Sequence, residues 1–416
     1  MGTSRRTSSD TAQHGTAAPI PARKAVTTFD AASRHERIEG KPPLIRVMRR
    51  LITGGVGLWA RVSTAVVRHL GWYGRVDPYV GYGTERYSRL ICRTVYAPEH
   101  SKSGARTRGI WGMLAIPAPH REVRIAIDGT PLETMQVGSS EVYDRPDPAR
   151  ATPTEYVSSD DAGYLDLVAE HRLSPGVHHV SYRVPRRKPV SANLFTIPAG
   201  SKVGIISDVD DTIMVTQVPT LWKAVYNLLF LNPRKRAPVP GMSVLFTKLA
   251  SLFPDAPFFY LSTSPWNVES SIRHFIADHG YPDGPLLLRD LDPRPKTFVP
   301  TGVQHKLEFA EQLMGDFPGM RFILIGDDGQ KDPTTYATIA KRYPGRVIAI
   351  GIRQLSPRES SPLGSVSGLS STQPMPVTDV PVFTGTTGAN LMKTMLPYLE
   401  RYVAGDAAPT RTPPRA

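Results

Sequence analysis

Three aspartates stand just after a short apolar run near the middle of this 416-residue chain. The run is Val203–Ile206, and the acidic residues are Asp208, Asp210 and Asp211. An apolar run without alternation is typical of a buried strand in a parallel sheet, and ligands of such sheets bind beyond the carboxyl ends of the strands. Closely packed carboxylates need a proton or a cation to offset their charge, and an all-oxygen ligand set favours Mg²⁺. A solvated acidic turn is the alternative that this stretch leaves open by itself.

Hydroxyl groups follow a second apolar run, Phe258–Leu261. Ser262, Thr263 and Ser264 lead from this run into a helical pattern. Hydroxyl and backbone N–H groups at such a junction suit a phosphate oxygen. Ser262 is the expected phosphate contact, and Ser264 is the alternative.

A second carboxylate cluster, Asp327, Asp328 and Asp332, follows the apolar run Phe322–Ile325. Upstream of it, Lys306 stands where a helical pattern starts, a position at which the helix dipole disfavours a cation. A buried role for Lys306, such as neutralising a phosphate, would explain this placement.

The elements that must position these residues lie between about 196 and 355, where apolar runs alternate with helix-length segments. This alternation predicts a parallel sheet with helices on both faces. The expected strands are Val203–Ile206, Phe258–Leu261, Leu286–Leu288, Phe322–Ile325 and Val347–Ile350. The expected helices are Val268–His279, Lys306–Met314 and Thr334–Arg342.

The four motifs together resemble those of the haloacid dehalogenase-like phosphatase superfamily. Ile-Ser-Asp-Val-Asp-Asp-Thr-Ile, Tyr-Leu-Ser-Thr-Ser-Pro-Trp, His-Lys and Ile-Gly-Asp-Asp-Gly-Gln-Lys-Asp-Pro are similar to the actin-patch-associated, Mg²⁺-dependent phosphatidate phosphatase branch. The resemblance covers residues from about 200 to 355, and the β-rich region upstream also resembles bacterial members. It implies an α/β fold with a Rossmann-like parallel sheet of haloacid dehalogenase type.

For catalysis, the resemblance implies a nucleophile and an acid/base. Asp208 would take the phosphoryl group as an aspartyl-phosphate. Asp210 would protonate the leaving alkoxide and then deprotonate the attacking water. Thr212 would hold the loop and orient Asp210. Ser262, with Thr263 beside it, and Lys306 would bind the phosphoryl oxygens.

The resemblance also implies a Mg²⁺ site as the cofactor site. Asp208, the carbonyl oxygen of Asp210 and Asp327 would bind the ion, and Asp328 or Asp332 would complete the shell. Relatives usually have serine where this chain has Asp328, which leaves the last ligand open.

Residues 76–195 show short alternating segments separated by turns, which predicts a smaller β-sandwich-like domain. Val123–Ile127, before the hairpin signal Asp128–Gly129, is one such segment. The region holds no group with catalytic or metal-ligand spacing, so we expect it to bind a partner or to act as a scaffold. The basic run Arg186–Lys188 is expected to be the exposed linker to the next domain.

The remaining boundaries follow from composition. Residues 1–42 are expected to be a disordered basic tail and 43–75 an amphipathic helical segment. Residues 356–380 are expected to be a linker, and 381–416 a C-terminal helix with a tail.

The net charge of +13 gathers at the front, where residues 1–72 hold 12 Lys/Arg against 4 Asp/Glu, or +8. Such a segment attracts anionic lipid headgroups or nucleic acid. The helix in 43–75 therefore has two interpretations, one on a membrane surface and one docked on the neighbouring domain. A single cysteine and the absence of a spanning segment predict a cytoplasmic protein, peripheral to the membrane in the first interpretation.

Substrate choice is expected to lie in the insert of residues 213–255, where the apolar run Leu221–Leu231 precedes the basic run Arg234–Arg236. This combination suits a phospholipid, and a helix packed on the sheet is the alternative. The loop Gly284–Pro300 is a second loop that could close over the site. Three functions compete: a phosphatase of phosphatidate or a related lipid phosphate, a phosphatase of a soluble or polynucleotide phosphate, and a non-enzymatic membrane or cytoskeletal adaptor.

Overall fold

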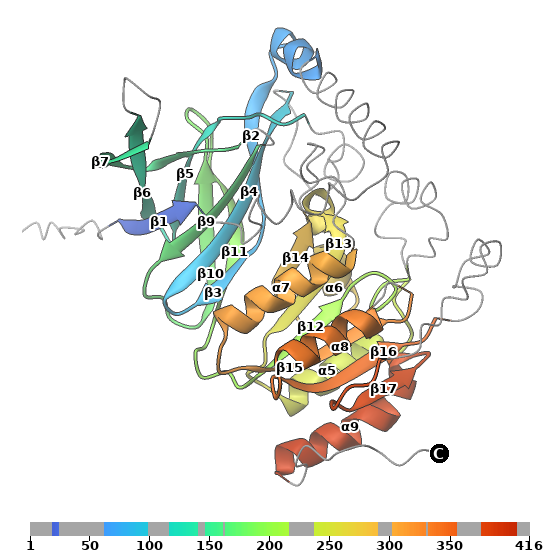
Figure 1. Ribbon diagram of the computed structural model, residues 1–416. Coiled ribbons are helices and arrows are strands. Elements are labelled where there is room, and N and C mark those ends of the chain that lie inside the picture. The colour runs from blue at the N-terminus through green and yellow to red at the C-terminus, as the bar shows by residue number, and fades with distance from the viewer. Residues whose placement is uncertain are drawn as a thin grey trace, which may run out of the picture.

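A computed structural model describes residues 19–24, 62–98, 116–139, 146–160, 163–215, 237–289, 302–329, 332–355 and 376–405 (Figure 1). These ranges form an all-β part followed by an α/β part. Several predicted segments lie outside them: residues 43–61 of the first helix, Leu221–Leu231, Arg234–Arg236 and most of the loop Gly284–Pro300.

The all-β part is one sheet, in the described ranges, of eleven strands. They are β1 (Ile20–Lys24), β2 (Tyr73–Pro78), β3 (Gly81–Thr84), β4 (Tyr87–Ala97), β5 (Glu122–Ile127), β6 (Thr130–Ser139), β7 (Pro146–Thr154), β8 (Tyr156–Ser158), β9 (Tyr164–Glu170), β10 (Gly176–Arg183) and β11 (Val190–Ile197). The sheet closes because β5 pairs with both β6 and β10, giving the ring β5-β6-β1-β9-β4-β3-β11-β10. The pairings of β1 with β6 and of β11 with β3 are parallel, so the barrel is mixed.

The predicted fold class is therefore wrong. We expected a haloacid dehalogenase-type sheet preceded by a β-sandwich-like domain, and the chain instead has a closed eight-stranded mixed barrel and a separate parallel sheet. Alternating strands look the same in a sandwich and a barrel, and only long-range pairings decide whether the sheet closes. One of these pairings uses Ile20–Lys24, which lies in the segment expected to be a disordered tail. The run Arg186–Lys188 is likewise not a linker, because it forms the turn between β10 and β11.

The separate sheet has six parallel strands in the order β14-β13-β12-β15-β16-β17. They are β12 (Val203–Asp208), β13 (Phe258–Pro265), β14 (Leu286–Arg289), β15 (Arg321–Asp327), β16 (Val347–Arg353) and β17 (Val382–Gly385). The five predicted strands are confirmed. The sixth, β17, was missed because only two of its four residues, Val382 and Phe383, are apolar, which leaves no apolar run to recognise.

Helices cover both faces of this sheet (Figure 1). They are α5 (Met242–Leu252), the short 3₁₀ helix η2 (Trp266–Val268), α6 (Glu269–Asp278), α7 (Gly302–Asp316), α8 (Asp332–Arg342) and α9 (Gly388–Ala404). Neighbouring residues of β12 show the two layers: Ile205 packs in the core that includes Phe246 of α5 and Leu391 of α9, and Ile206 in the core that includes Leu313 of α7. A buried central strand of this kind fixes the position of the residue that ends it, Asp208.

The barrel packs directly against the α/β part. Tyr79 stacks on Trp266 with ring centroids 4.9 Å apart, and Trp266 is only 2% exposed. Arg89 of β4 forms a two-pronged ion pair with Asp316 at the end of α7, with N–O distances of 3.0 and 3.1 Å. Trp266 is therefore a packing residue between the two parts.

Residues 62–69 are helical and dock on the barrel through Val67, which packs with Tyr96 and Ala118. This part of the first helix thus follows the docked interpretation on one face. Among the described helices, none is both long enough and apolar enough to cross a bilayer.

Candidate active site

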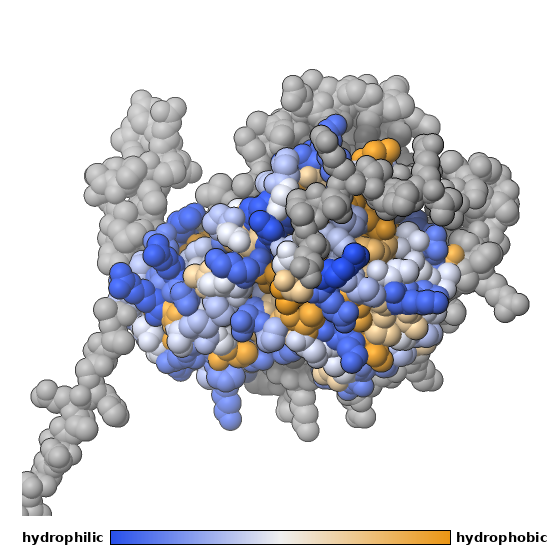
Figure 2. All heavy atoms as spheres, turned by 90° about the horizontal axis from the view of Figure 1, so that it is seen from below, coloured by the Kyte–Doolittle hydropathy of each residue, from blue (hydrophilic) through white to orange (hydrophobic). Residues whose placement is uncertain are grey.

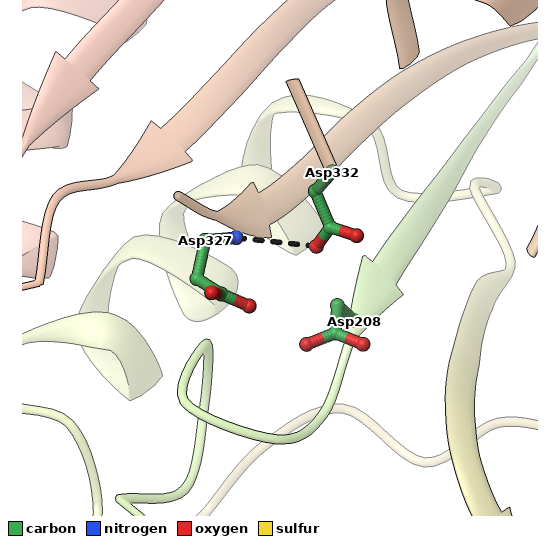
Figure 3. Close-up of side chains that lie close together, drawn as sticks. All are labelled: Asp208, Asp327 and Asp332. Atoms are coloured by element: carbon green, nitrogen blue, oxygen red, sulfur yellow. Dashed lines mark hydrogen bonds between the residues drawn. The ribbon is translucent and has the colours of Figure 1, made fainter. Parts of the chain in front are cut away.

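Three buried aspartates converge at the carboxyl edge of the parallel sheet (Figure 3). Asp208 ends β12 and Asp327 ends β15, and these strands are hydrogen-bonded neighbours. Asp332 comes from the start of α8, which follows β15. Each of the three offers a carboxylate oxygen, and these oxygens lie within 4.8 Å of one another. The first and second carboxylate clusters of the sequence are thus two halves of one site.

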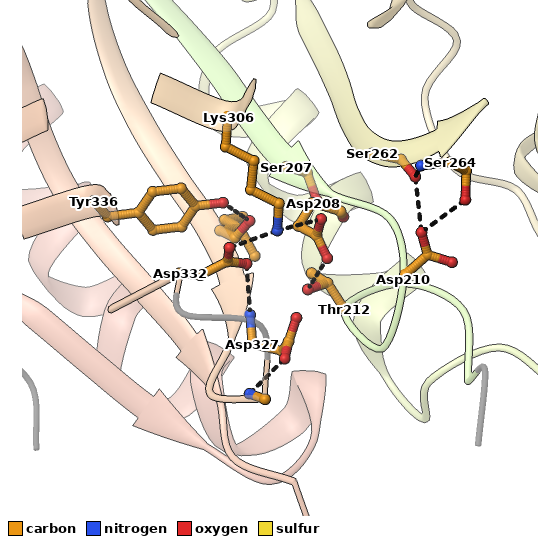
Figure 4. Close-up of polar contacts among 12 residues, drawn as sticks. Ser207, Asp208, Asp210, Thr212, Ser262, Ser264, Lys306, Asp327, Asp332 and Tyr336 are labelled. Carbon is orange, nitrogen blue, oxygen red and sulfur yellow. Dashed lines mark hydrogen bonds and ion pairs between the residues drawn. The ribbon is translucent and has the colours of Figure 1, made fainter. Parts of the chain in front are cut away.

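Lys306 reaches this cluster from α7 and pairs with two of its members (Figure 4). Its Nζ lies 2.6 Å from Oδ1 of Asp208 and 2.5 Å from Oδ1 of Asp332, and the residue is 1% exposed. The burial predicted for Lys306 is confirmed. Its expected place at the helix start is wrong, because α7 begins at Gly302 and Lys306 lies one turn inside.

The cluster carries more negative charge than Lys306 can balance. Burial raises the pKa of Asp208 well above its usual value, Lys306 opposes this rise, and Asp332 and Asp327 reinforce it. Burial and then Asp332 raise the pKa of Asp327 to about 8. Although burial disfavours the ammonium of Lys306, Asp208 and Asp332 outweigh it and raise its pKa. A surplus of buried carboxylate oxygen around one ammonium fits a hard divalent cation, so these residues can hold a metal.

Asp332, and not Asp328, belongs to the cluster. The second oxygen of Asp332, Oδ2, accepts the backbone N–H of Asp327 at 3.2 Å. Asp328 instead accepts the backbone N–H of Leu355 at 2.8 Å, and no oxygen of it joins the metal-binding group found in the described residues. Asp332 is already engaged on both oxygens, by Lys306 and by Asp327, so its part is to position these two groups as much as to bind a cation.

The expected acid/base and the expected phosphate contacts lie together beside this cluster. In Figure 4, Asp210 points toward the two serines at the end of β13. The hydroxyls of Ser262 and Ser264 both donate to Oδ2 of Asp210, at 2.7 and 3.2 Å, and the N–H of Ser264 donates to the Ser262 hydroxyl at 2.9 Å. The half-buried Thr263 lies between them. Both serines that are candidates for the phosphate contact therefore lie beside the expected acid/base, Asp210, and the structure favours neither of them.

Thr212 differs from its expected role. Its hydroxyl donates to Oδ2 of Asp208 at 3.1 Å, whereas we expected it to orient Asp210. With Lys306 on the other carboxylate oxygen, this bond fixes the orientation of Asp208 from two sides.

Three further residues shape the site, and sequence reasoning missed two of them, Gly326 and Tyr336. A Cβ on Gly326 would lie 2.3 Å from Oδ2 of Asp332, so only glycine lets this carboxylate pack against β15. The Tyr336 hydroxyl donates to the carbonyl of Ile325 at 2.9 Å, which ties α8 to the same strand. Arg353 donates to the carbonyl of Asp211 at 2.7 Å and so holds the loop after Asp210. Of the two missed residues, only Gly326 carried a readable signal, because glycine at a strand end marks close approach of other groups.

Comparisons with known proteins agree with this geometry. Residues 203–354 match a family model described as "Phosphatidate phosphatase APP1, catalytic domain". The predicted resemblance to this family is confirmed.

Two curated yeast proteins extend the comparison. The phosphatidate phosphatase APP1 of Saccharomyces cerevisiae is 27% identical over 209 residues, which are 49% of this chain and 35% of that protein. An uncharacterized protein of Schizosaccharomyces pombe is 26% identical over 171 residues, which are 40% of this chain and 28% of that protein. The chain therefore spans about a third of the length of the curated relatives that it matches.

Solved structures add nothing to the family match. The PilB minor pilin of Streptococcus sanguinis covers 69% of this chain and 89% of its own at 9% identity, with a TM-score of 0.25. A likeness of this size supports no inference about function.

The charge surplus in the phosphatidate phosphatase-like domain predicts how its stability varies with pH. The folded-state pKa of Asp327 is raised to about 8, so between about pH 4 and pH 8 the folded state holds a proton that the unfolded state has lost. The contribution of Asp327 to stability is thus fully present below about pH 4 and lost as the pH rises through 8, a change on the order of a few kcal/mol. A divalent cation that binds these oxygens, for which Mg²⁺ is the test ion, should stabilise the protein more at pH 8 than at pH 5, because protons compete with the cation for the same oxygens.

Urea unfolding of the wild type and of Asp327→Asn, each with EDTA or Mg²⁺, measures this effect. In EDTA, the free energy of unfolding of the wild type should fall below that of Asp327→Asn by an amount that grows with pH. This difference should shrink when Mg²⁺ is added. A difference that does not change with pH would contradict the assignment of a charge surplus to this cluster.

Proposed function

We propose that this protein is a Mg²⁺-dependent phosphatase that hydrolyses a phosphomonoester through an aspartyl-phosphate on Asp208. We propose phosphatidate or a related lipid phosphate as its substrate and the cytoplasmic side of an anionic membrane as its place of action. The observation that carries the proposal is the convergence of Asp208, Asp327, Asp332 and Lys306 in one buried cluster, inside the segment that matches the family model.

Asp208 and Asp327 would hold the Mg²⁺, with Asp332 supporting them and the carbonyl oxygen of Asp210 as the further ligand. When bound, the ion supplies the positive charge that lets a carboxylate approach a phosphate group and that stabilises the transition state. Lys306 adds a fixed cation beside the same carboxylate, and its raised pKa keeps it protonated throughout the neutral range.

The residues then divide the reaction into two displacements. An oxygen of Asp208 forms a bond to phosphorus while the bond from phosphorus to the alcohol oxygen breaks, and Asp210 gives that oxygen a proton. Asp210 next takes a proton from a water whose oxygen attacks phosphorus, which releases inorganic phosphate and restores Asp208. Thr212 and Lys306 hold the two oxygens of Asp208, so the nucleophile loses little freedom on substrate binding.

Ser262 and Ser264 would exchange their bonds with Asp210 for bonds to the phosphoryl oxygens. Because both hydroxyls donate to the same oxygen of Asp210, their transfer to substrate would leave that carboxyl available for the leaving group. Substrate binding would thus free the carboxyl group of Asp210 for proton transfer to the leaving group. Thr263 would bind beside them.

A substrate panel tests the proposed function. It comprises phosphatidate vesicles, lysophosphatidate, sugar phosphates and 3′-phosphorylated oligonucleotides, each with Mg²⁺ or EDTA. We expect release of phosphate from phosphatidate at least about tenfold faster than from sugar phosphates, since tail contacts add binding energy, and no release in EDTA. Preference for the oligonucleotide would favour the polynucleotide alternative, which the basic composition also suits. No release from any substrate would favour the adaptor.

A further inference from the structure

A basic pocket lies on the barrel, away from the aspartate cluster. It has a volume of about 380 Å³ and is formed by β2 on one side and by the β10–β11 hairpin on the other. Its walls are apolar, with Val76, Val184 and Val190, and four cationic side chains line it: Arg75, Arg186, Arg187 and Lys188. The last three occupy the hairpin turn.

The charges of the turn are not neutralised by the described part of the chain. Arg75 is paired with Asp77, 3.0 Å away. By contrast, no carboxylate of the described residues forms an ion pair with Arg186, Arg187 or Lys188, all of which are exposed. Arg187 lies over the ring of Tyr73, 3.8 Å from its centroid, which holds one cation at the pocket wall. Three adjacent cations over an apolar pocket suit an anionic group that carries an apolar body.

The backbone of this turn has an unusual conformation at one of the three basic residues. The N–H of Arg187 donates to the carbonyl of Val184 at 3.1 Å, with Pro185 second and Arg186 third in the turn. Arg186 has a φ of 65°, a left-handed conformation in which glycine or asparagine is normally found. An arginine at this position costs backbone energy that a glycine would not.

An apolar stripe lies on the helical segment that precedes β2, the strand that forms one side of this pocket. Val62, Val66 and Leu70 recur at four-residue steps along the helix of residues 62–69 and its end, and they are 54%, 51% and 62% exposed. The opposite side of the helix docks on the barrel through Val67. Leu70 lies three residues before Tyr73, the first residue of β2 and part of the pocket wall. Figure 1 shows the helical segment before β2 above the barrel. Figure 2 shows the molecule from below, where apolar residues lie in groups among hydrophilic ones.

We propose that the stripe and the basic pocket together form a docking surface for an anionic phospholipid bilayer, separate from the catalytic site. The valines and the leucine enter the interface between headgroups and acyl chains, and the cations of the turn bind lipid phosphates. A bilayer accounts for both features at once, whereas nucleic acid would use the cations and leave the apolar stripe in water. The inference takes its choice of partner from the proposed lipid substrate.

Vesicle sedimentation tests the docking surface without requiring catalysis. The full chain is mixed with vesicles of phosphatidylcholine alone or with phosphatidylserine, and the wild type is compared with Arg186→Gly/Arg187→Gln/Lys188→Gln. Each cation near an anionic surface is worth about fivefold in binding, so the triple variant should bind about 100-fold more weakly to the anionic vesicles. The matched control, Lys248→Gln/Lys341→Gln/Lys393→Gln, removes three exposed cations of the α/β part and should bind like the wild type.

Urea unfolding and competition with soluble anions distinguish loss of docking from loss of folding and from binding of another ligand. Arg186→Gly alone should unfold at the same or higher urea concentration than the wild type, because glycine relieves the left-handed strain, while its vesicle binding falls. Val62→Ser/Val66→Ser should weaken vesicle binding also. Equal binding by the triple variant and the wild type would overturn the proposal. The proposal would also be overturned if free glycerol 3-phosphate displaced the wild type from the vesicles, or if the wild type bound a single-stranded oligonucleotide more tightly than the anionic vesicles.

Activity assays keep this inference distinct from the proposed function. On soluble dioctanoyl phosphatidate, the triple variant should turn over like the wild type, whereas on anionic vesicles its rate should fall. If no phosphate is released from any substrate, the proposed function fails and the sedimentation result still decides the docking surface.

Discussion

Replacement of Asp208 by asparagine should lower phosphate release by about three orders of magnitude or more while the fold stays at least as stable. The amide keeps the shape of the side chain and can still accept the Thr212 hydrogen bond, but it removes the anionic oxygen that would attack phosphorus. It also removes one of several buried like charges, and the raised pKa of Asp208 means that its ionised form costs folding energy. Loss of activity together with unchanged or greater stability is therefore the expected signature.

Phosphate release at neutral pH with Mg²⁺ measures the first half of this prediction, and urea unfolding of the same preparation at neutral pH in EDTA measures the second. Asp283→Asn is the matched control, because Asp283 is an exposed carboxylate paired with Arg273, far from the reacting groups. The proposed nucleophile would be wrong if Asp208→Asn retained substantial activity. Loss of activity with a large loss of stability would show a structural effect instead.

Replacement of Lys306 by methionine should abolish activity and also destabilise the fold, by about 3–5 kcal/mol. Lys306 is the cation that pairs with both Asp208 and Asp332, and methionine would leave these carboxylates buried beside each other and Asp327. The variant should recover part of its stability at acidic pH, where the carboxylates are protonated, and part on addition of Mg²⁺.

The double variant Lys306→Met/Asp332→Asn isolates the charge effect. Removing one of the two orphaned charges should restore much of the stability but none of the activity, because the cation beside the nucleophile is still missing. Lys248→Met, on the exposed side of α5, is the control for loss of a lysine. If Lys306→Met were as stable as the wild type at neutral pH without Mg²⁺, the ion-pair arrangement would be contradicted.

The two readouts also separate the roles of neighbouring residues. Asp208 should matter for chemistry and not for stability, and Lys306 for both. This difference arises from charge balance alone, since both side chains are fully buried in the same cluster.

The sequence by itself determined the parallel sheet and the identity of most residues at its carboxyl edge. Each apolar run was long enough to be recognised as a buried strand. The polar residue that follows such a strand must then lie at the carboxyl edge of the sheet. Because the carboxyl ends of parallel strands lie at one edge, Asp208 and Asp327 had to approach each other once β12 and β15 became neighbours.

Only the tertiary structure decided between Asp328 and Asp332. Successive side chains at a strand end point to opposite sides, so Asp328 turns away from Asp327 and meets the backbone of Leu355. Asp332 returns to the cluster because α8 starts there and packs against β15, with Gly326 leaving room for its carboxylate. Spacing along the chain favours neither residue.

The barrel was decided in the same way. Its closure rests on pairings such as that of Ile20–Lys24 with β6, between segments more than a hundred residues apart, which local alternation cannot reveal. The basic pocket depends on long-range contacts as well, since Arg187 lies over Tyr73 only when β10, β11 and β2 come together. Local patterns fix which residues a strand delivers, and long-range contacts fix which of them meet.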